Sequence, residues 1–308
     1  MRLVASIGLL ILTSSSIGLG ISTTSMNDGR NLQPNEEPKN LFQSVLTDMD
    51  GDGVRELVRI LPVKTKGVER LSIHDPKTKV ENNRIEMDLA EHWGRGSFPT
   101  SIASGNIDTD SNMEIAITRK SSVNMRTALY DFESFDEKGG RSVGQMRLVQ
   151  EFGKDWGRKY FAQQAVFGDL NGDGRDELIL STNAPDRLHN SDPNPKRPGP
   201  IMVYARIGTS KTFQLAYHVD GHFKGFKVKH IAIRDMNKDG KMDILVTEKV
   251  KQDPKKPKEA RYKIFTPEQA FHVEGTSRLK LISKGRKEFA NSFFVQKTET
   301  KIASADVK

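Results

Sequence analysis

Short runs of apolar residues, each bounded by turn-forming residues, recur along most of this chain. Four of these runs are alike because each directly follows an acidic loop; they read LVRIL (57–61), IAITR (115–119), LILST (178–182) and ILVTE (244–248). Short runs of Val, Ile, Leu, Phe and Thr, broken by Gly, Asp, Asn and Pro, are typical of β-strands. No long stretch shows the 3.6-residue period of an amphipathic helix. The pattern therefore predicts an all-β fold.

The acidic loops that precede these strands are nine residues long and recur at nearly even spacing. Their first residues are Asp48, Asn106, Asp169 and Asp235, which lie 58, 63 and 66 positions apart. We number the loops one to four and the residues within each loop 1 to 9. A period of this size, with strand-forming sequence between the loops, indicates radial or solenoid repetition.

The residue types in the loops suit a metal ion. Positions 1, 3, 5 and 9 are Asp, Asn or Glu, and position 7 can offer its backbone carbonyl. Oxygen ligands on alternate residues favour a hard cation such as calcium. We therefore predict calcium ligands in loop one (Asp48, Asp50, Asp52, Val54, Glu56), loop two (Asn106, Asp108, Asp110, Asn112, Glu114), loop three (Asp169, Asn171, Asp173, Arg175, Glu177) and loop four (Asp235, Asn237, Asp239, Lys241, Asp243).

The EF-hand is excluded as the source of this pattern. An EF-hand needs Glu at position 12 and flanking helices, whereas position 12 is here Arg59, Ile117, Leu180 or Val246. The remaining alternative, an acidic turn without metal, explains one loop more readily than four. Loop two departs most from the pattern, because it begins with Asn106 and carries Ser111 where the other loops have glycine. We therefore expect it to have the lowest affinity.

The pattern D-x-[DN]-x-D-G-x-x-[DE], repeated about every sixty residues, resembles the FG-GAP or VCBS repeat family. Phe167-Gly168, just before loop three, is similar to the motif that names the family. The resemblance covers roughly residues 40 to 308. It implies a β-propeller in which each calcium loop joins the two inner strands of a blade. That fold hosts adhesion domains, lectins and some lyases, so the resemblance implies a fold and an ion but no activity.

A second repeat sets the number of blades. Trp93, Trp156 and His222 each lie 13 residues before the start of the next loop, and Gly-Arg follows both tryptophans. Lys284-Gly285-Arg286 aligns with this motif, and the following Ser292–Gln296 aligns with an inner strand. The chain thus predicts four full blades and a partial fifth. We favour a five-bladed propeller over a four-bladed ring with a C-terminal appendage.

The N-terminus has the composition of a targeting segment. Arg2 precedes an uncharged run from Leu3 to Ile21, so residues 1–25 are interpreted as a signal peptide or, alternatively, a membrane anchor. Residues 26–40 form a polar linker, and residues 41–308 form the propeller. The protein is therefore expected to be secreted, periplasmic or at the cell surface, with membrane contact only through an uncleaved N-terminal segment. The chain has no cysteine, which excludes disulfides and thiolate chemistry.

Charge and loop placement indicate where a partner would bind. The net charge is +8, and residues 248–308 contribute 15 Lys and Arg against 8 Asp and Glu. A basic surface suits an anionic carbohydrate or extracellular protein, or serves only solubility, and no nucleic-acid motif is present. Long loops and the Trp-Gly-Arg motifs share the rim opposite the metal loops. The tryptophans are interpreted as packing wedges or sugar platforms. Candidate ligand residues are Trp93, Arg95, Trp156, Arg158, Lys255, Lys256 and Lys258.

Enzyme motifs are missing from the sequence, and no catalytic residue is assigned. There is no G-x-S-x-G elbow and no phosphate-binding loop. The leading hypothesis is a calcium-binding module that recognises carbohydrate or protein. The alternative is a carbohydrate-active enzyme such as a polysaccharide lyase, whose residues would converge only in three dimensions.

Overall fold

The chain divides into two compact units, residues 1–39 and 40–308. The computed structural model describes only part of the second unit: residues 44–62, 69–74, 84–88, 97–108, 110–121, 126–138, 141–157, 159–186, 198–207, 210–219, 222–248, 260–267 and 279–287. The N-terminal segment and the linker of the sequence interpretation lie outside these ranges. Within the described residues no helix is long and apolar enough to span a bilayer.

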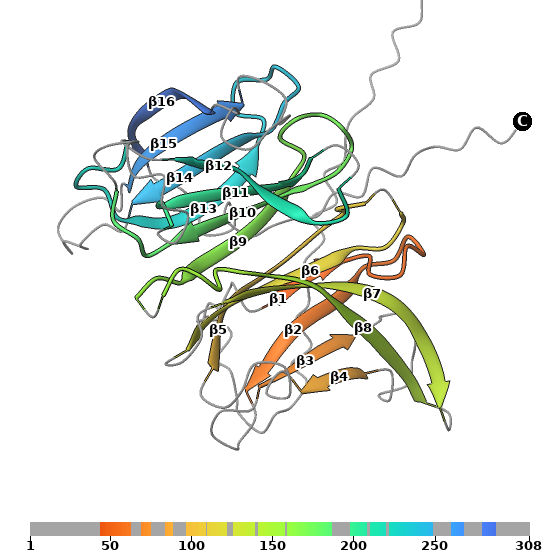
Figure 1. The fold of residues 1–308 in the computed structure, drawn as a ribbon. Coiled ribbons are helices and arrows are strands. Elements are labelled where there is room, and N and C mark those ends of the chain that lie inside the picture. Colours follow the sequence, from red (N-terminus) through yellow and green to blue (C-terminus); the bar gives the residue numbers. More distant parts are fainter. Residues whose placement is uncertain are drawn as a thin grey trace, which may run out of the picture. The chain divides into compact units, whose positions relative to one another are not determined.

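The described residues form sixteen strands and no helix, which confirms the all-β prediction. The strands build four antiparallel sheets, and each sheet contains four strands in chain order (Figure 1). The first sheet comprises β1 (Ser44–Thr47), β2 (Glu56–Pro62), β3 (Glu69–His74) and β4 (Arg84–Asp88), and the second comprises β5 (Ser97–Gly105), β6 (Glu114–Ser121), β7 (Thr127–Lys138) and β8 (Arg141–Phe152). The third comprises β9 (Ala162–Gly168), β10 (Glu177–Thr182), β11 (Ile201–Arg206) and β12 (Phe213–Val219), and the fourth comprises β13 (Val228–Arg234), β14 (Asp243–Glu248), β15 (Ala260–Pro267) and β16 (Leu279–Lys287).

The apolar runs that follow the acidic loops form the second strand of each sheet. Every residue of β10 is buried, and every residue of β14 except Glu248 is buried. A strand that is covered on both faces has a continuous apolar sequence instead of an alternating one. This burial explains why the runs read LILST and ILVTE. Each acidic loop therefore connects the first and second strands of one sheet.

Neighbouring sheets pack through their first strands, because β1 contacts β5, β5 contacts β9, and β9 contacts β13. The glycine that ends a first strand makes this approach possible. A Cβ on Gly105 would lie 2.4 Å from the Cβ of Phe167, and a Cβ on Gly168 would lie 2.3 Å from Cγ2 of Ile233. Phe167-Gly168 is thus a packing motif: the phenylalanine covers the glycine of the preceding sheet, and its own glycine receives the next sheet.

The hydrophobic core follows the same order. One buried cluster joins the first and second sheets and includes Val58 and Ile115, and another joins the second and third and includes Leu129 and Leu178. A third cluster, around Ile179 and Ile244, joins the third and fourth sheets. Each sheet is therefore stabilised by its neighbours in the chain, as expected for a repeat architecture.

The described strands do not form a closed ring, so the propeller stays a prediction. The partial fifth blade, with its expected strand Ser292–Gln296, lies outside the described residues. The alignment that led to it needs a correction. Lys284-Gly285-Arg286 lies inside β16, the outer strand of the fourth sheet. By contrast, Trp156 and Gly157 lie in the connection between β8 and β9. The two aligned segments therefore occupy different structural elements, because β16 continues to Lys287.

Candidate functional site

All four acidic loops share one backbone arrangement. The carboxylate at position 9 accepts a hydrogen bond from the backbone N–H at position 2. The donor–acceptor pairs are Met49 N to Glu56 Oε2 (2.6 Å), Ile107 N to Glu114 Oε2 (2.9 Å), Leu170 N to Glu177 Oε2 (2.7 Å) and Met236 N to Asp243 Oδ2 (2.9 Å). Because position 9 begins the second strand of each sheet, this bond ties the loop to its hairpin.

Positions 3 and 5 also act alike in every loop. The side-chain oxygen at position 3 accepts the N–H of position 5, and the side-chain oxygen at position 5 accepts the N–H of position 7. Such turns are typical of Asp and Asn, whose short side chains reach the backbone two residues further on. The loops therefore curl so that alternate side chains point to the inside of the turn.

Loops one and two bring carboxylates together. Asp48, Asp50 and Glu56 each place one oxygen within 4.8 Å of the others. Asp108, Asp110 and Glu114 form the corresponding group in loop two. Within the described residues these are the two groups of three acidic side chains that already converge closely enough to hold a metal ion.

Three buried oxygens in the loops lack a hydrogen-bond partner within the described structure. They are Oδ1 of Asp48, Oε1 of Glu114 and Oδ1 of Asp243, on residues that are 3%, 0% and 0% exposed. A buried carboxylate oxygen without a partner costs free energy, because it has lost its water. A cation would satisfy these oxygens, so the residues fit a metal ion by their chemistry as well as by their spacing.

The protonation of the position 9 carboxyls supports this fit. Burial, together with the smaller effects of the neighbouring Asp50 and Asp48, raises the pKa of Glu56 from 4.5 to about 7. Burial likewise raises the pKa of Glu114 to about 8 and that of Glu177 to about 9, with smaller contributions from nearby aspartates. Without a cation, these carboxyls therefore hold protons near neutral pH. A bound cation would favour their ionised form.

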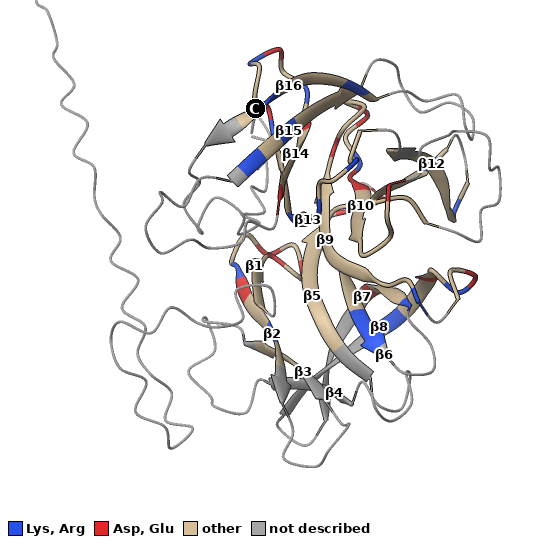
Figure 2. Cartoon of the chain, turned by 90° about the vertical axis from the view of Figure 1, so that its left-hand side faces the viewer, with Lys and Arg blue, Asp and Glu red and all other residues tan. Residues whose placement is uncertain are grey.

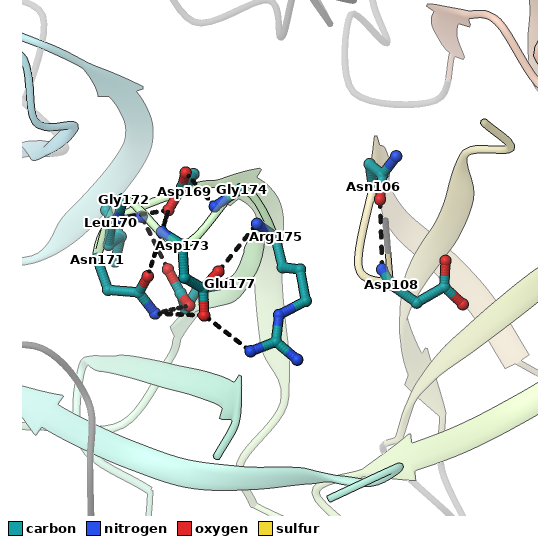
Figure 3. A network of polar contacts seen from close by, with 10 residues as sticks. All are labelled: Asn106, Asp108, Asp169, Leu170, Asn171, Gly172, Asp173, Gly174, Arg175 and Glu177. Atoms are coloured by element: carbon teal, nitrogen blue, oxygen red, sulfur yellow. Dashed lines mark hydrogen bonds and ion pairs between the residues drawn. The ribbon is translucent and has the colours of Figure 1, made fainter. Parts of the chain in front are cut away.

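Loop three satisfies its oxygens internally. Oδ1 of Asp169 accepts the N–H of Gly172 (2.6 Å) and of Asp173 (3.1 Å), and Oδ2 accepts the N–H of Gly174 (2.9 Å). The side-chain amide of Asn171 donates to Oε1 of Glu177 (2.8 Å) and to Oδ2 of Asp173 (3.3 Å), as Figure 3 shows. The amide hydrogens thus take the place that a cation would take between these carboxylates.

Loop four follows loop three. Oδ1 of Asp235 accepts the N–H of Lys238 and of Asp239, and Oδ2 accepts the N–H of Gly240. The amide of Asn237 donates to Asp239 over 2.9 Å. The four loops therefore form two pairs. Loops one and two gather three carboxylates. In loops three and four an asparagine amide donates to the position 5 carboxylate, and in loop three it also donates to the position 9 carboxylate.

Adjacent loops touch each other. The N–H of Asp176 donates to the carbonyl of Asn106 (2.7 Å), and the N–H of Asn106 donates to Oδ2 of Asp176 (2.9 Å). Asp176 lies at position 8 of loop three, and burial raises its pKa to about 6. Loop one reaches loop two as well, because a Cβ on Gly51 would lie 2.3 Å from Oγ of Ser111.

Sequence reasoning missed Asp176, although a signal was present. Position 8 is Arg in loop one and Met in loops two and four, so an acidic residue there is unique to loop three. Ser111, which replaces the expected glycine, instead fills the contact with Gly51. The predicted weakness of loop two rested on its residue types alone. The structure nevertheless places its three carboxylates within 4.8 Å of one another, as in loop one.

The position 7 residues Val54, Asn112, Arg175 and Lys241 follow the turn as expected, each donating its N–H to position 5. Their predicted role as carbonyl ligands stays a prediction. Arg175 also contacts the carboxylate of Asp173, with Nη2 and Oδ2 2.9 Å apart. This contact places a cationic group beside a carboxylate of loop three.

The predicted ligand face is described only at Trp156. This residue is 5% exposed, packs in the cluster between the second and third sheets, and shares a side-chain hydrogen bond with Tyr204. Its ring is therefore a packing wedge, and the sugar-platform interpretation does not apply to this conformation. The other candidates, Trp93, Arg95, Arg158, Lys255, Lys256 and Lys258, lie outside the described residues.

Comparison with known proteins adds no identification to this geometry. No family model matches the chain, and no curated protein matches it significantly. The resemblance to FG-GAP and VCBS repeats therefore stays a prediction that rests on the loop residues themselves.

Proposed function

We propose that the four loops bind calcium and that the protein is an exported, calcium-stabilised binding module with propeller architecture. The observation that carries the proposal is the set of buried oxygens without partners, two of which belong to groups of three convergent carboxylates. In all four loops the position 9 carboxylate accepts a hydrogen bond from the position 2 N–H, and this shared arrangement supports a common ligand.

Calcium is the ion that this donor set favours. Every side-chain donor is an oxygen of Asp, Asn or Glu, which disfavours zinc and copper because these metals prefer nitrogen and sulfur. Magnesium demands a near-ideal octahedron and keeps much of its water. The loops offer several charged oxygens on a flexible turn, and calcium tolerates such irregular shells. Export would place them where calcium is abundant.

The proposed role of the ions is structural. Each loop connects the first and second strands of its sheet, and its position 9 carboxylate is buried at the start of the second strand. An ion there would hold the hairpin and leave the other loops free to bind a partner. Four sheets packed in chain order support a propeller, and the five-bladed form is the one we favour. The partner class we propose is carbohydrate or extracellular protein.

A calcium titration of the purified protein tests the metal proposal. Calcium should raise the melting temperature and excess EGTA should lower it by roughly 5–10 °C, since one site at a hundredfold excess over Kd contributes about 2.7 kcal/mol. The matched variants are Asp110→Asn in loop two and Asp155→Asn, an exposed aspartate outside the loops. Only the first should reduce the calcium effect. Melting curves that are identical in calcium and EGTA would contradict the proposal.

Two further measurements test the identity of the ion and the propeller fold separately. Magnesium in place of calcium should give a much smaller rise in melting temperature if calcium is the ion. A crystal structure of the calcium-loaded protein would test the propeller. An open row of four sheets, without a fifth sheet between the fourth and the first, would refute the five-bladed form and leave the metal proposal intact.

A further inference from the structure

The outer hairpin of the fourth sheet carries basic residues that the metal loops do not use. β15 and β16 pair antiparallel so that Lys263 lies opposite Lys284. We call Arg261, Lys263 and Lys284 the basic hairpin, and Figure 2 shows basic segments on both strands. Like charges directly opposite each other in an antiparallel pair are destabilising. The Lys263–Lys284 pair therefore favours a role outside folding.

Protection of the sheet edge explains only half of this arrangement. β16 is the last strand of its sheet, and charged residues on an edge strand prevent pairing with another chain. That role accounts for Lys284. It does not account for Lys263, because β15 lies between β14 and β16 and has no free edge.

Lys263 is held above two aromatic rings. Its Nζ atom lies 5.4 Å from the ring centroid of Phe223 and 5.3 Å from that of Phe226. Both rings are buried, with 2% and 8% exposure. Such a contact attracts the ammonium group and fixes its position. Burial lowers the pKa of Lys263, and Lys284 and Arg261 lower it further, against the opposing effect of Asp186 and Glu248.

The neighbouring acidic groups are already engaged. Glu248 accepts hydrogen bonds from Nε and Nη2 of Arg261, and Nη2 also donates to the carbonyl of Gly225 (2.7 Å). Asp186 accepts the N–H of Phe223 over 2.9 Å. Arg261 is thereby fixed by its own partners. Lys263 and Lys284 face each other as neighbouring cations, and an external anion would relieve the repulsion between them.

We propose that the basic hairpin binds a linear polysaccharide that carries carboxylate or sulfate groups. Charge complementarity carries this choice. The aromatic rings of this site lie buried beneath Lys263, so they offer no surface on which the bases of a single-stranded nucleic acid could stack. The inference rests on the proposed role as a binding module and names its partner. It uses none of the metal ligands.

The test compares two double variants that each remove two positive charges. The site variant is Lys263→Met with Lys284→Gln, in which methionine still covers the two rings. The control is Lys154→Met with Lys211→Gln, at exposed lysines outside the fourth sheet. Binding to chondroitin sulfate, which carries both anionic groups, is measured by calorimetry in calcium at low salt. Neutral dextran is the negative ligand.

The parent should bind chondroitin sulfate and not dextran. The site variant should bind at least about tenfold more weakly, and the control should change by less than about threefold. The melting temperature of the site variant should equal or exceed that of the parent, because a like-charge pair is gone. If that variant misfolds, Lys284→Gln alone, at an exposed position, should still weaken binding by about threefold.

Three results would overturn the inference: no binding by the parent, equal losses in the two double variants, or binding to polyglutamate or anionic vesicles that is as tight as to chondroitin sulfate. Different results would refute the calcium proposal and the basic-hairpin proposal. A protein that binds chondroitin sulfate but ignores EGTA would refute calcium alone, and a protein that calcium stabilises without polysaccharide binding would refute the basic hairpin alone.

Discussion

Loops two and three have the same length, the same hydrogen bond from the position 2 N–H to the position 9 carboxylate, and the same turns. They differ in the partners of their carboxylates. Loop two gathers Asp108, Asp110 and Glu114, and one oxygen of Glu114 lacks a partner within the described structure. In loop three, Asp169 accepts three backbone N–H groups and Asn171 bridges the other acids. One loop is therefore arranged to receive a cation, while the other is stable by itself and must rearrange its amide to bind one.

The two loops differ at position 1, which is Asn106 in loop two and Asp169 in loop three, and at position 3. Aspartate there adds another negative charge, as in loops one and two, whereas asparagine adds two donor hydrogens, as in loops three and four. Counting oxygen ligands alone treats these residues as equal. The hydrogen-bond capacity of the amide makes them different in the absence of metal.

The largest expected effect concerns pH in the metal-free protein. Burial raises the pKa of Glu114 to about 8 and of Glu177 to about 9, from 4.5. The folded state binds these protons more tightly than the unfolded state. The stabilisation is therefore complete below pH 4.5 and is lost as pH rises through 8 and 9. In EGTA, we expect the melting temperature to fall by roughly 10 °C between about pH 6 and about pH 10.

Two variants divide this pH effect between the loops. Glu114→Gln should remove the loss that is complete near pH 8, and Glu177→Gln should remove the loss that continues to about pH 9. Saturating calcium should flatten the profile of the parent, because the ion favours the ionised carboxylates. A metal-free protein that is equally stable across this range, followed by circular dichroism, would show that the two carboxyls are not buried as described.

The second prediction is that equivalent substitutions in loops two and three change the free energy of unfolding in opposite directions. In EGTA, Asp169→Asn should lower the free energy of unfolding by about 1–3 kcal/mol, because it weakens three hydrogen bonds to a carboxylate. Asp110→Asn in loop two should leave it unchanged or raise it by up to about 1 kcal/mol, since repulsion within the acidic group is relieved. Urea unfolding measures both. The same sign for both variants would mean that the two loops do not differ as the structure indicates.

The third prediction tests the contact between the two loops. Asp176→Ala should lower the free energy of unfolding by about 1–2 kcal/mol and weaken calcium binding in loop two, because Asn106 loses its acceptor. Asp176→Asn keeps an acceptor oxygen and should have a much smaller effect. Calorimetric titration with calcium gives both quantities. If alanine and asparagine have equal effects, the hydrogen bond to Asn106 is not what joins the loops.

The smallest expected effect separates loop four from loop three. Position 4 is glycine in loop three, with a φ of 79° at Gly172, but is Lys238 in loop four, with a φ of 63°. A side chain in this left-handed region is strained. Lys238→Gly should therefore raise the free energy of unfolding by roughly 0.5–1 kcal/mol. Lys241→Gly, at a position without positive φ, is the matched control and should not raise it.

The sequence by itself determined the strands and the loops. Apolar runs buried on both faces and acidic turns with glycine have strong local preferences, so β10, β14 and their loops could be located without a structure. The recurrence of the loops also predicted several similar sheets. These features depend on residues close together in the chain, where the period and the turn residues carry enough information.

Only the tertiary structure decided how the loops differ and what lies between them. The hydrogen bonds between Asp176 and Asn106 join residues 70 positions apart, and the burial of Trp156 depends on its packing between two sheets. The pairing of Lys263 with Lys284 depends on the register of β15 against β16. Sequence periodicity cannot specify such contacts, because register and side-chain burial result from packing among distant segments.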